Sequence, residues 1–426
     1  MTGADRRPRA LVVVTGSELV RGDRTDLNGP FLARELLERG LEAARVTIVG
    51  DRPDELEAAL HEGLEADLCL VSGGLGPTHD DRTIELLARA AGRTLLLGPA
   101  LEEEIGSLSR AFATRLGRPF ADFEPGVRKQ ATLPEGARSL GLAGTAPGVL
   151  LDLGACVAVA LPGPPAELQR LWARAVETEP LRRVLGRVRP PRRHLLRLFG
   201  VSESAVARAL TEAGGDGNGV EVTICARDFE IHVDVLLEEG AEERGETLLA
   251  GLRSPLERYL FAEDGEAVEA LVLARCRARG LTLATAESCT GGLVAARLTS
   301  VPGSSDVFRG GVVAYSDASK RDVLRVPGEL LRSDGAVSAA VAEAMAAGAR
   351  EHLGADVGVS VTGVAGPAGG TAEKPVGLVF VHAVGPEGGR GVELAYPADR
   401  DSIRRRATTT ALHLVRRVLE PGFPRG

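Results

Sequence analysis

The sequence predicts a multidomain α/β protein. Its 426 residues are more than one hydrophobic core usually holds. Short apolar runs alternate with amphipathic helical patterns, which is typical of a parallel sheet covered by helices on both faces. We expect a three-layer α/β/α domain over residues 1–175, a small α+β domain over 176–262 and a second α/β domain over 263–426.

In the first domain the alternation of period-2 and helical patterns is regular. It predicts strands at residues 10–15, 44–49 and 67–72, helices at 30–39, 53–65, 83–91 and 101–116, and a closing hairpin at 148–153 and 156–161. After Pro162-Gly-Pro-Pro we expect a helix that runs through Trp172. The Arg- and Pro-rich residues 182–193 are interpreted as a linker.

The remaining residues give a small unit followed by another sheet. The small unit is predicted as a strand at 194–199, a helix at 203–213, a hairpin at 220–226 and 230–237, and a helix at 242–259. The last domain is predicted to contain strands at 281–286, 311–315, 356–361 and 376–383, with a helix at 293–299 after the first of them.

Composition excludes several function classes. The net charge of −8 and the aromatic share of 3% argue against a nucleic-acid-binding face, so no nucleic-acid partner is expected. The five cysteines form no CxxC pair, which favours free thiols in a reducing cytoplasm. Since no run of 18 apolar residues occurs, we predict a cytoplasmic protein without a membrane span.

A glycine-rich loop follows the predicted strand at 67–72. Its glycines, Gly73, Gly74 and Gly76, could present backbone amides to phosphate oxygens at the carboxyl end of the sheet. The nearby carboxylates Asp80 and Asp81, with Asp51 after the preceding strand, could hold a divalent metal such as Mg²⁺. The alternative is a generic glycine turn whose aspartates cap a helix.

A second loop, Glu287-Ser-Cys-Thr-Gly-Gly, lies between an apolar strand and a helix. Ser288 at this turn is a candidate nucleophile, although the same position suits a helix N-cap. No histidine accompanies a glycine-rich turn here, so the expected base is Lys320, with Tyr315 relaying or stabilising the proton. Only three of the 51 basic residues are lysines, which favours a role for Lys320 that arginine cannot fill. Cys289 is the rival nucleophile.

Further candidates lie downstream. Thr362 and Gly363 end a predicted strand in another glycine-rich turn and could contact a phosphate or a carboxamide. Arg400 and Arg404 open the terminal helix and could bind a phosphate bidentately. Because most of the basic residues are arginines, each of these two could equally be an ordinary surface residue.

The N-terminal motifs resemble those of CinA proteins. These motifs are GGLGPTHDDRT, Thr15-Gly-Ser-Glu-Leu, Gly144-Thr-Ala-Pro-Gly and Leu161-Pro-Gly-Pro-Pro. The resemblance implies a molybdopterin-binding-like domain with a nucleotide site near Glu18, Asn28, Thr78 and Lys129. It also implies metal-dependent ADP-ribose pyrophosphatase activity with Asp51 and Asp81 at the acidic positions.

Two positions depart from the family pattern. Val127 and Gly141 stand where the family usually has asparagines. These departures put the nucleotide specificity of the first domain in question.

The C-terminal motifs AESCTGG, VPGSSDVFRGGVVAYSDASK, GAVS and VTGVAGPAGG resemble the nicotinamide mononucleotide deamidase domain of the same family. The resemblance implies hydrolysis of the carboxamide to the acid, with release of ammonia and without metal or other cofactor. Ser288 would attack, and Lys320 with Tyr315 would handle the proton. The residues expected to shape the oxyanion and substrate site are Glu287, Cys289, Thr290, Gly291, Gly292, Thr362, Gly363, Arg400 and Arg404.

The middle unit has an element order similar to a KH-type fold, as in CinA proteins, but it lacks a basic GXXG loop. We therefore expect it to join domains or subunits, and we expect a homodimer. A nucleotide-binding or sensing protein with one or both sites inactive is the alternative function. Molybdopterin transfer is a weaker alternative for the first domain.

Overall fold

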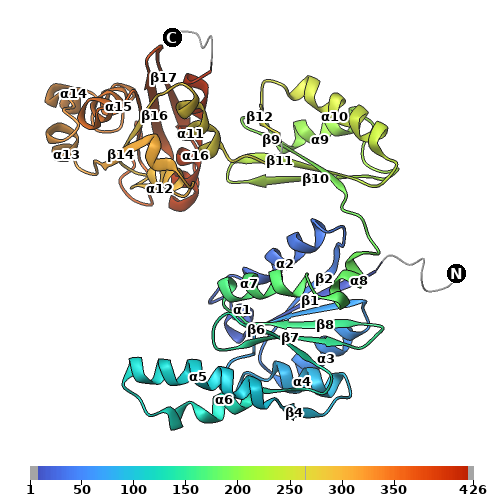
Figure 1. Cartoon of the computed structure of the whole chain (residues 1–426). Coiled ribbons are helices and arrows are strands. Elements are labelled where there is room, and N and C mark those ends of the chain that lie inside the picture. Colours follow the sequence, from blue (N-terminus) through green and yellow to red (C-terminus); the bar gives the residue numbers. More distant parts are fainter. Residues whose placement is uncertain (1–7, 264, 421–426) are drawn as a thin grey trace. The chain divides into compact units, whose positions relative to one another are not determined.

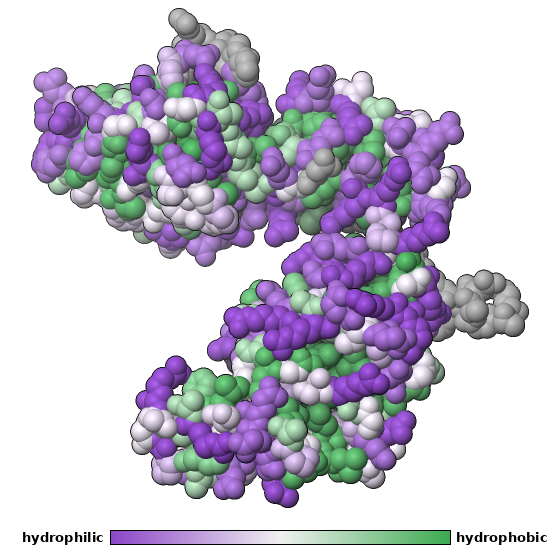
Figure 2. All heavy atoms as spheres, viewed as in Figure 1, coloured by the Kyte–Doolittle hydropathy of each residue, from purple (hydrophilic) through white to green (hydrophobic). Residues whose placement is uncertain are grey.

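The computed structural model describes residues 8–263 and 265–420, which form two compact units divided between Pro191 and Arg192 (Figure 1). The predicted multidomain α/β class is confirmed. Among the described residues, no helix is both long and apolar enough to cross a membrane. On the face drawn in Figure 2, hydrophilic side chains cover much of the surface and apolar ones show in smaller areas between them.

The first unit is a three-layer α/β/α sandwich, as predicted. Its six-stranded sheet has the order β2-β1-β3-β8-β7-β6. Strands β1, β2, β3 and β8 are parallel to one another, and β7 is antiparallel to both of its neighbours, β8 and β6. The strands are β1 (Ala10–Thr15), β2 (Ala43–Val49), β3 (Leu68–Ser72), β6 (Arg138–Leu142), β7 (Pro147–Asp152) and β8 (Val157–Leu161). Core residues of α2 (Asn28–Leu37) and α7 (Pro165–Ala175) cover one face, and those of α3 (Pro53–Leu64) and α4 (Thr83–Ala90) cover the other.

Several short elements of this unit lie outside the prediction. They are α1 (Ser17–Val20), η1 (Phe120–Asp122), α6 (Glu124–Gln130), the pair β4 (Leu95–Leu97) and β5 (Thr132–Pro134), and α8 (Glu179–Leu185); the predicted long helix is α5 (Pro99–Leu116). The linker prediction for 182–193 is wrong at both ends, which belong to α8 and to β9 (Arg192–Leu198). Leu181 and Val184 bury against the α7 face of the core, and this burial continues the helix into the Arg-rich segment.

The second unit begins with a four-stranded antiparallel sheet of order β10-β11-β9-β12. Its other elements are α9 (Glu203–Glu212), β10 (Val220–Arg227), β11 (Glu230–Leu237), α10 (Glu242–Leu256) and β12 (Leu260–Ala262). The predicted α+β unit is therefore present. Because β12 adds a fourth strand beside β9, its β-α-β-β-α-β topology is ferredoxin-like rather than KH-type.

The same unit contains a five-stranded sheet of order β14-β13-β15-β16-β17. Its strands are β13 (Leu283–Glu287), β14 (Phe308–Val313), β15 (Val357–Gly363), β16 (Leu378–Gly385) and β17 (Gly388–Ala395), with η2 (Ser304–Asp306) before β14. Core residues of α11 (Val268–Ala278), α12 (Leu293–Thr299) and α16 (Arg400–Val418) pack on one face. Those of α14 (Gly328–Ser333) and α15 (Ala339–Leu353) pack on the other, and α13 (Asp317–Asp322) follows β14. Since β14 ends at Val313, the predicted strand at 311–315 is displaced and Tyr315 lies beyond it.

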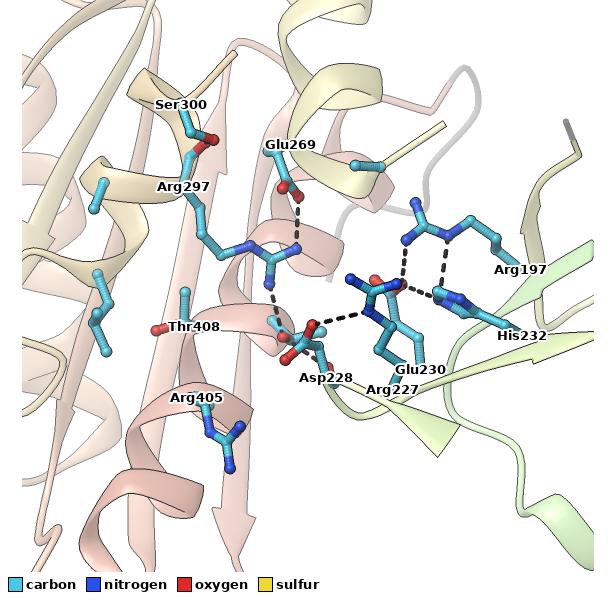
Figure 3. A pocket seen from close by; sticks show the side chains of 14 residues that line it. Arg197, Arg227, Asp228, Glu230, His232, Glu269, Arg297, Ser300, Arg405 and Thr408 are labelled. Carbon is cyan, nitrogen blue, oxygen red and sulfur yellow. Dashed lines mark hydrogen bonds and ion pairs between the residues drawn. The ribbon is translucent and has the colours of Figure 1, made fainter. Parts of the chain in front are cut away.

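The tip of the β10–β11 hairpin contacts α16. Asp228 and Phe229 form a tight turn with positive φ angles of 49° and 65°, and Thr409 Oγ1 donates to the Asp228 carbonyl at 3.0 Å. Beside this contact lies a cavity of about 530 Å³ (Figure 3). Its lining comes from β9, the hairpin, the start of α11, α12 and α16, so a part of the small α+β sheet faces the helix that follows Ser288.

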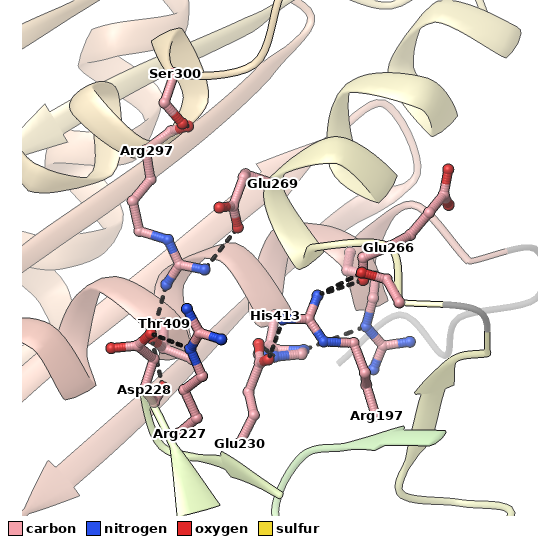
Figure 4. A network of polar contacts seen from close by, with 12 residues as sticks. Arg197, Arg227, Asp228, Glu230, Glu266, Glu269, Arg297, Ser300, Thr409 and His413 are labelled. Carbon is pink, nitrogen blue, oxygen red and sulfur yellow. Dashed lines mark hydrogen bonds and ion pairs between the residues drawn. The ribbon is translucent and has the colours of Figure 1, made fainter. Parts of the chain in front are cut away.

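A buried polar network joins the hairpin to α16 (Figure 4). Glu230 is 2% exposed and accepts from His413 Nε2 at 2.8 Å, while His232 Nε2 lies 3.3 Å and Arg197 3.6 Å from its carboxylate. Burial alone would raise the pKa of Glu230, but these partners outweigh it and lower the pKa to about 2. His413 is stacked on Phe199 at 3.8 Å, and burial lowers its pKa to about 4.

We expect the second unit to lose stability as the pH falls. Between pH 6.5 and about 4 an unfolded chain protonates His413 while the folded chain keeps it neutral, so stability declines through that range. Below pH 4.5 the ionised Glu230 adds a second loss, which continues towards pH 2. Urea unfolding between pH 7 and pH 4.5 measures the first effect. His413→Gln should show a smaller decline than wild type, and the exposed control His352→Gln should follow wild type; equal slopes for all three would contradict the assignment.

Candidate functional site

The nucleophile candidate Ser288 lies directly after β13, the middle one of the three parallel strands. Its amide donates to the Val361 carbonyl at 2.8 Å, which extends the pairing of β13 and β15 by one residue. Ser288 is only 8% exposed, and Gly291 and Gly292 adopt φ angles of 60° and 99° that turn the chain into α12. The strand therefore ends with its serine at the carboxyl edge of the sheet, as the sequence predicted.

Glu287 holds the turn after Ser288 together. Its carboxylate accepts from the amides of Gly292 at 2.9 Å, Val294 at 3.1 Å and Ala295 at 2.9 Å. These are first-turn donors that a helix cannot satisfy internally, and a carboxylate also complements the positive end of the helix dipole. Since Glu287 is 1% exposed and both oxygens are used, its place is that of a helix cap and not of the predicted substrate contact.

The side chain of Lys320 contacts Ser288. It lies on α13, is 2% exposed, and places Nζ 3.2 Å from Ser288 Oγ and 3.0 Å from the Ala314 carbonyl. Burial lowers the pKa of Lys320, and Asp317 and Cys289 oppose this only in part. The Ala314 carbonyl takes one N–H of the amine and thereby fixes its orientation. The structure thus brings together the two residues that the sequence paired across 32 positions.

The loop amides next to Ser288 are available to a ligand. Among the described residues, the amides of Cys289 and Thr290 donate to no other residue, whereas those of residues 291 to 295 are engaged within the loop and α12, chiefly on Glu287. Burial raises the pKa of the Cys289 thiol to about 11, so it is a poor rival nucleophile. Thr290 is fully buried, and its Oγ1 has no partner within the described part of the chain.

The predicted arginines hold backbone. Arg404 donates from Nε to the Cys289 carbonyl at 3.1 Å and from Nη2 to the Thr290 carbonyl at 3.0 Å. Arg400 donates from Nη1 to the Gly366 carbonyl at 2.6 Å and from Nη2 to Tyr315 Oη at 3.0 Å. Tyr315 is 62% exposed, and among the described residues it makes no hydrogen bond to Ser288 or Lys320, so the predicted proton relay is not formed in this structure.

Thr362 and Gly363 are also structural. The Thr362 hydroxyl donates to the Ala336 carbonyl at 2.7 Å and is buried. A side chain at Gly363 would come within 2.7 Å of the Leu378 carbonyl. They join β15 to its neighbours, and the Thr362 hydroxyl donates its one proton within the protein and not to a ligand.

A second candidate site lies in the first unit, at the carboxyl ends of β1 and β3. A cavity of about 330 Å³ is lined by the loop after β1, by the glycine-rich loop after β3 and by the start of α7. The carboxylates that line it are Glu18, Asp51, Asp80, Asp81 and Glu167. Gly73, Gly74 and Gly76 line it as predicted, and added Cβ atoms there would lie 2.4 Å from the Thr15 carbonyl, 2.3 Å from Thr83 Oγ1 and 2.4 Å from the Asp81 carboxylate.

The predicted metal ligands of this cavity are used within the protein. Asp51 accepts from Thr15 Oγ1 at 3.1 Å and from the Ser17 amide at 2.9 Å, while Asp81 accepts from the Thr78 amide at 2.9 Å. Asp80 also accepts from the Thr78 hydroxyl. No three His, Cys, Asp or Glu side chains of the described ranges form a group that could hold a metal ion. The three aspartates are thus engaged with Thr15, Ser17 and Thr78 and are the N-cap residue of neither α1 nor α4, while the metal site stays a prediction.

Other predicted residues of this unit lie around the loop. Lys129 donates to the Thr78 carbonyl and lines a neighbouring cavity of about 270 Å³. Asn28 donates to Ser72 Oγ at 2.9 Å and to the Gly163 carbonyl at 2.7 Å, and its Oδ1 is buried without a partner among the described residues. Val127 packs in a small core with Leu101, Ile105 and Ala131.

The remaining departure from the family pattern, Gly141, has a φ of 83° and lies beside Arg174, which donates to the carbonyls of Leu140 and Leu142. Glu167 was not predicted at this site. Burial raises its pKa, and its position in the first turn of a helix after the Pro-Gly-Pro-Pro motif is the sequence signal that could have found it.

The fold and the Ser–Lys geometry define a multidomain α/β protein with two glycine-rich loops, each at the carboxyl end of a parallel strand. Residues 11–182 match the probable molybdopterin binding domain, and residues 265–419 match the CinA C-terminal domain. A CinA-like protein of Mycolicibacterium gilvum (strain PYR-GCK) is 45% identical, with 97% of this chain and 99% of that protein covered. The CinA-like protein of Mycobacterium tuberculosis (strain ATCC 25177 / H37Ra) is 42% identical, with 98% and 99% covered.

Among solved structures, the competence/damage inducible protein CihA from Agrobacterium tumefaciens is 41% identical over 37% of this chain and 98% of that one, with a TM-score of 0.35. The full-length relatives place the chain in a family. The chain belongs to the CinA family.

The cap formed by Glu287 gives a test of the site's construction. Glu287→Gln replaces one acceptor oxygen by an NH₂ group that faces backbone amides, so we expect a loss of about 2–3 kcal/mol in the stability of the second unit. Glu329→Gln, in the exposed first turn of α14, should cost well under about 1 kcal/mol. Urea unfolding and amide exchange at Val294 and Ala295 measure both; matching behaviour of the two variants would show that the cap is unimportant.

Proposed function

We propose that this chain hydrolyses the carboxamide of nicotinamide mononucleotide to the carboxylate and releases ammonia. The observation that carries the proposal is the buried contact of 3.2 Å between Lys320 Nζ and Ser288 Oγ. A structural serine at a turn needs no lysine, and a buried lysine without a carboxylate partner is costly unless its amine is neutral. Together they form a Ser–Lys dyad, with the serine as nucleophile and the lysine as general base.

The chemistry follows from the positions of these groups. A neutral Lys320 amine accepts the Ser288 proton as Oγ attacks the carboxamide carbon, and the same ammonium then protonates the leaving nitrogen, which departs as ammonia. The acyl ester on Ser288 is cleaved by a water that Lys320 deprotonates, so the carboxylate is released and the serine is restored. The amides of Cys289 and Thr290 are the donors available to the oxyanion of each tetrahedral intermediate.

Arginines on α16 support this scheme indirectly. Arg404 fixes the carbonyls of Cys289 and Thr290, so the amides that follow Ser288 are held in position. Arg400 and the exposed Tyr315 form a pair near the same loop, and their free donor positions suit the phosphate of the nucleotide. Tyr315 is thus better placed to orient substrate than to carry a proton to Lys320. No metal is needed in this scheme.

For the first unit we propose nucleotide binding in the 330 Å³ cavity, supported by the tight glycine-rich loop at its wall. Five carboxylates and no Lys or Arg line this cavity, so an anionic ligand would need a neutralising partner there. Hydrolysis of ADP-ribose, and molybdopterin transfer, remain predictions from the resemblance. The described residues assemble no metal group for the former. The homodimer also remains a prediction.

The deamidase proposal is tested by ammonia release from nicotinamide mononucleotide in EDTA. We expect turnover by wild type and a fall of at least about a hundredfold in Ser288→Ala, Lys320→Ala and Lys320→Arg, because arginine cannot give up its proton. Lys374→Ala, at another of the three lysines, is the matched control and should retain activity. Tyr315→Phe should raise KM more than it lowers kcat.

The pH profile is a separate readout. Since Lys320 must be neutral and burial lowers its pKa, kcat/KM should rise with pH to a plateau reached below the ordinary lysine value of 10.5. Activity that persists in Ser288→Ala would assign the attack to water or Cys289. Absence of turnover in folded wild type would favour the alternative function, a nucleotide-binding or sensing protein.

A further inference from the structure

The cavity beside the β10–β11 hairpin has the size of a small-molecule site. Its volume of about 530 Å³ is in the range of ligand pockets. Four arginines line it, and they come from four separate segments: Arg197 from β9, Arg227 from the hairpin, Arg297 from α12 and Arg405 from α16 (Figure 3). The 330 Å³ cavity of the first unit has no basic lining at all, so the two cavities differ in the charge they can accept.

The acidic groups of this cavity are largely committed to the protein. Glu230 is shared by Arg197 and His232 (Figure 3) and by His413 (Figure 4), and Glu269 lies 2.6 Å from Arg297. The remaining acid, Asp228, lies 3.9 Å from Arg227, a loose and exposed pair. The four arginines face three carboxylates, and the lining carries one positive charge in excess in a chain of net charge −8.

Arg405 supplies that excess. Among the described residues it has no ion pair and no hydrogen bond from its side chain, and it is exposed on α16. Thr408 and Thr409 line the same cavity, but they are buried and donate their hydroxyl protons to the carbonyls of Arg404 and Asp228. A guanidinium with free donors and a second, loosely paired arginine in one cavity match the oxygens of a phosphate group.

We propose that this cavity binds a phosphate-bearing metabolite of up to mononucleotide size, with Arg405 and Arg227 as its principal cationic contacts. The hairpin turn at Asp228–Phe229 supports a built site, because two non-glycine residues with positive φ are held there by the contact from Thr409. This turn places Arg227 at the cavity wall.

The same ligand would act on the Ser288 loop, a step that rests on the proposed function. The cavity is lined by Leu293, Ala296, Arg297 and Ser300, one face of α12, whose first turn is held by Glu287. Arg297 also donates to Thr409 of α16 at 2.8 Å, and α16 carries the Arg404 that holds the loop carbonyls. A phosphate that competes for Arg297 therefore acts on both helices that position the nucleophile.

Isothermal titration calorimetry of the full chain tests the site with inorganic phosphate, adenosine monophosphate and, as the uncharged control, adenosine. We expect binding of both phosphates but not of adenosine, and a rise of at least about tenfold in Kd for Arg405→Gln. Arg208→Gln, an exposed arginine on α9 with only a 4.0 Å ion pair, is the matched control and should bind as wild type does. Arg405 is exposed, so unchanged melting of both variants is expected and is measured alongside.

Equal Kd values for wild type and Arg405→Gln, or equal binding of adenosine and its monophosphate, would overturn the proposed site. Ammonia release from nicotinamide mononucleotide with and without added phosphate is the second readout. A phosphate effect in wild type and Arg208→Gln that is absent in Arg405→Gln supports the coupling, and the same effect in all three overturns it. If wild type releases no ammonia, the proposed function fails while the calorimetry still decides whether the site exists.

Discussion

The buried carboxylate of Glu287 is the contact on which the C-terminal site depends. It satisfies three amide donors at the start of α12 and thereby lets the helix begin with only five residues between it and the strand. Without an internal acceptor those amides would have to face solvent or a ligand, and the turn would lose its fixed shape. Because the cap uses the amides beyond residue 291, the two amides directly after Ser288 are left for a reacting oxygen. A structural requirement and a catalytic one are therefore met by a single side chain.

Helix α16 links that turn to a distant part of the fold. Its first turns carry Arg400 and Arg404, which bind carbonyls of the glycine-rich loops, and its later turns carry Thr409 and His413, which hold the β10–β11 hairpin. The neutral His413 ring satisfies both neighbours, since Nε2 donates to Glu230 and Nδ1 faces the Nε of Arg416 at 3.4 Å. This explains why burial beside a carboxylate does not protonate the ring. The small α+β sheet is thus anchored through polar contacts to the helix that positions the nucleophile loop.

Much of the fold and the central pair of the site could be predicted from the sequence because both depend on local patterns. The strand before Ser288 and the helix after it follow from local sequence patterns, and the scarcity of lysine follows from the composition. Tyr315 was misjudged because β14 ends two residues earlier than its apolar run suggested, and this displaces the side chain to the surface. The roles of Arg404 and of Glu230 depend on contacts across 115 and 183 residues, respectively, and no local pattern specifies such partners. The hydrogen bonds that the carboxylates of the first unit accept from Thr78 and Ser17 could not be predicted, since they form only once the loops are folded.

The choice of basic residue distinguishes the two kinds of work that positive charge does here. Arginine occupies the positions where a permanent charge binds carbonyls, carboxylates or, as proposed, phosphate; its planar donors suit those partners and it cannot titrate. Lys320 occupies the one buried position where the amine faces a hydroxyl and a carbonyl and makes no ion pair with a carboxylate among the described residues. An arginine there would be a buried, permanent and uncompensated charge, whereas a lysine can shed its proton and lower the cost of burial. The same deprotonation that makes the position tolerable in the folded protein makes the amine a base, so the stability of this core and its proposed chemistry impose the same residue.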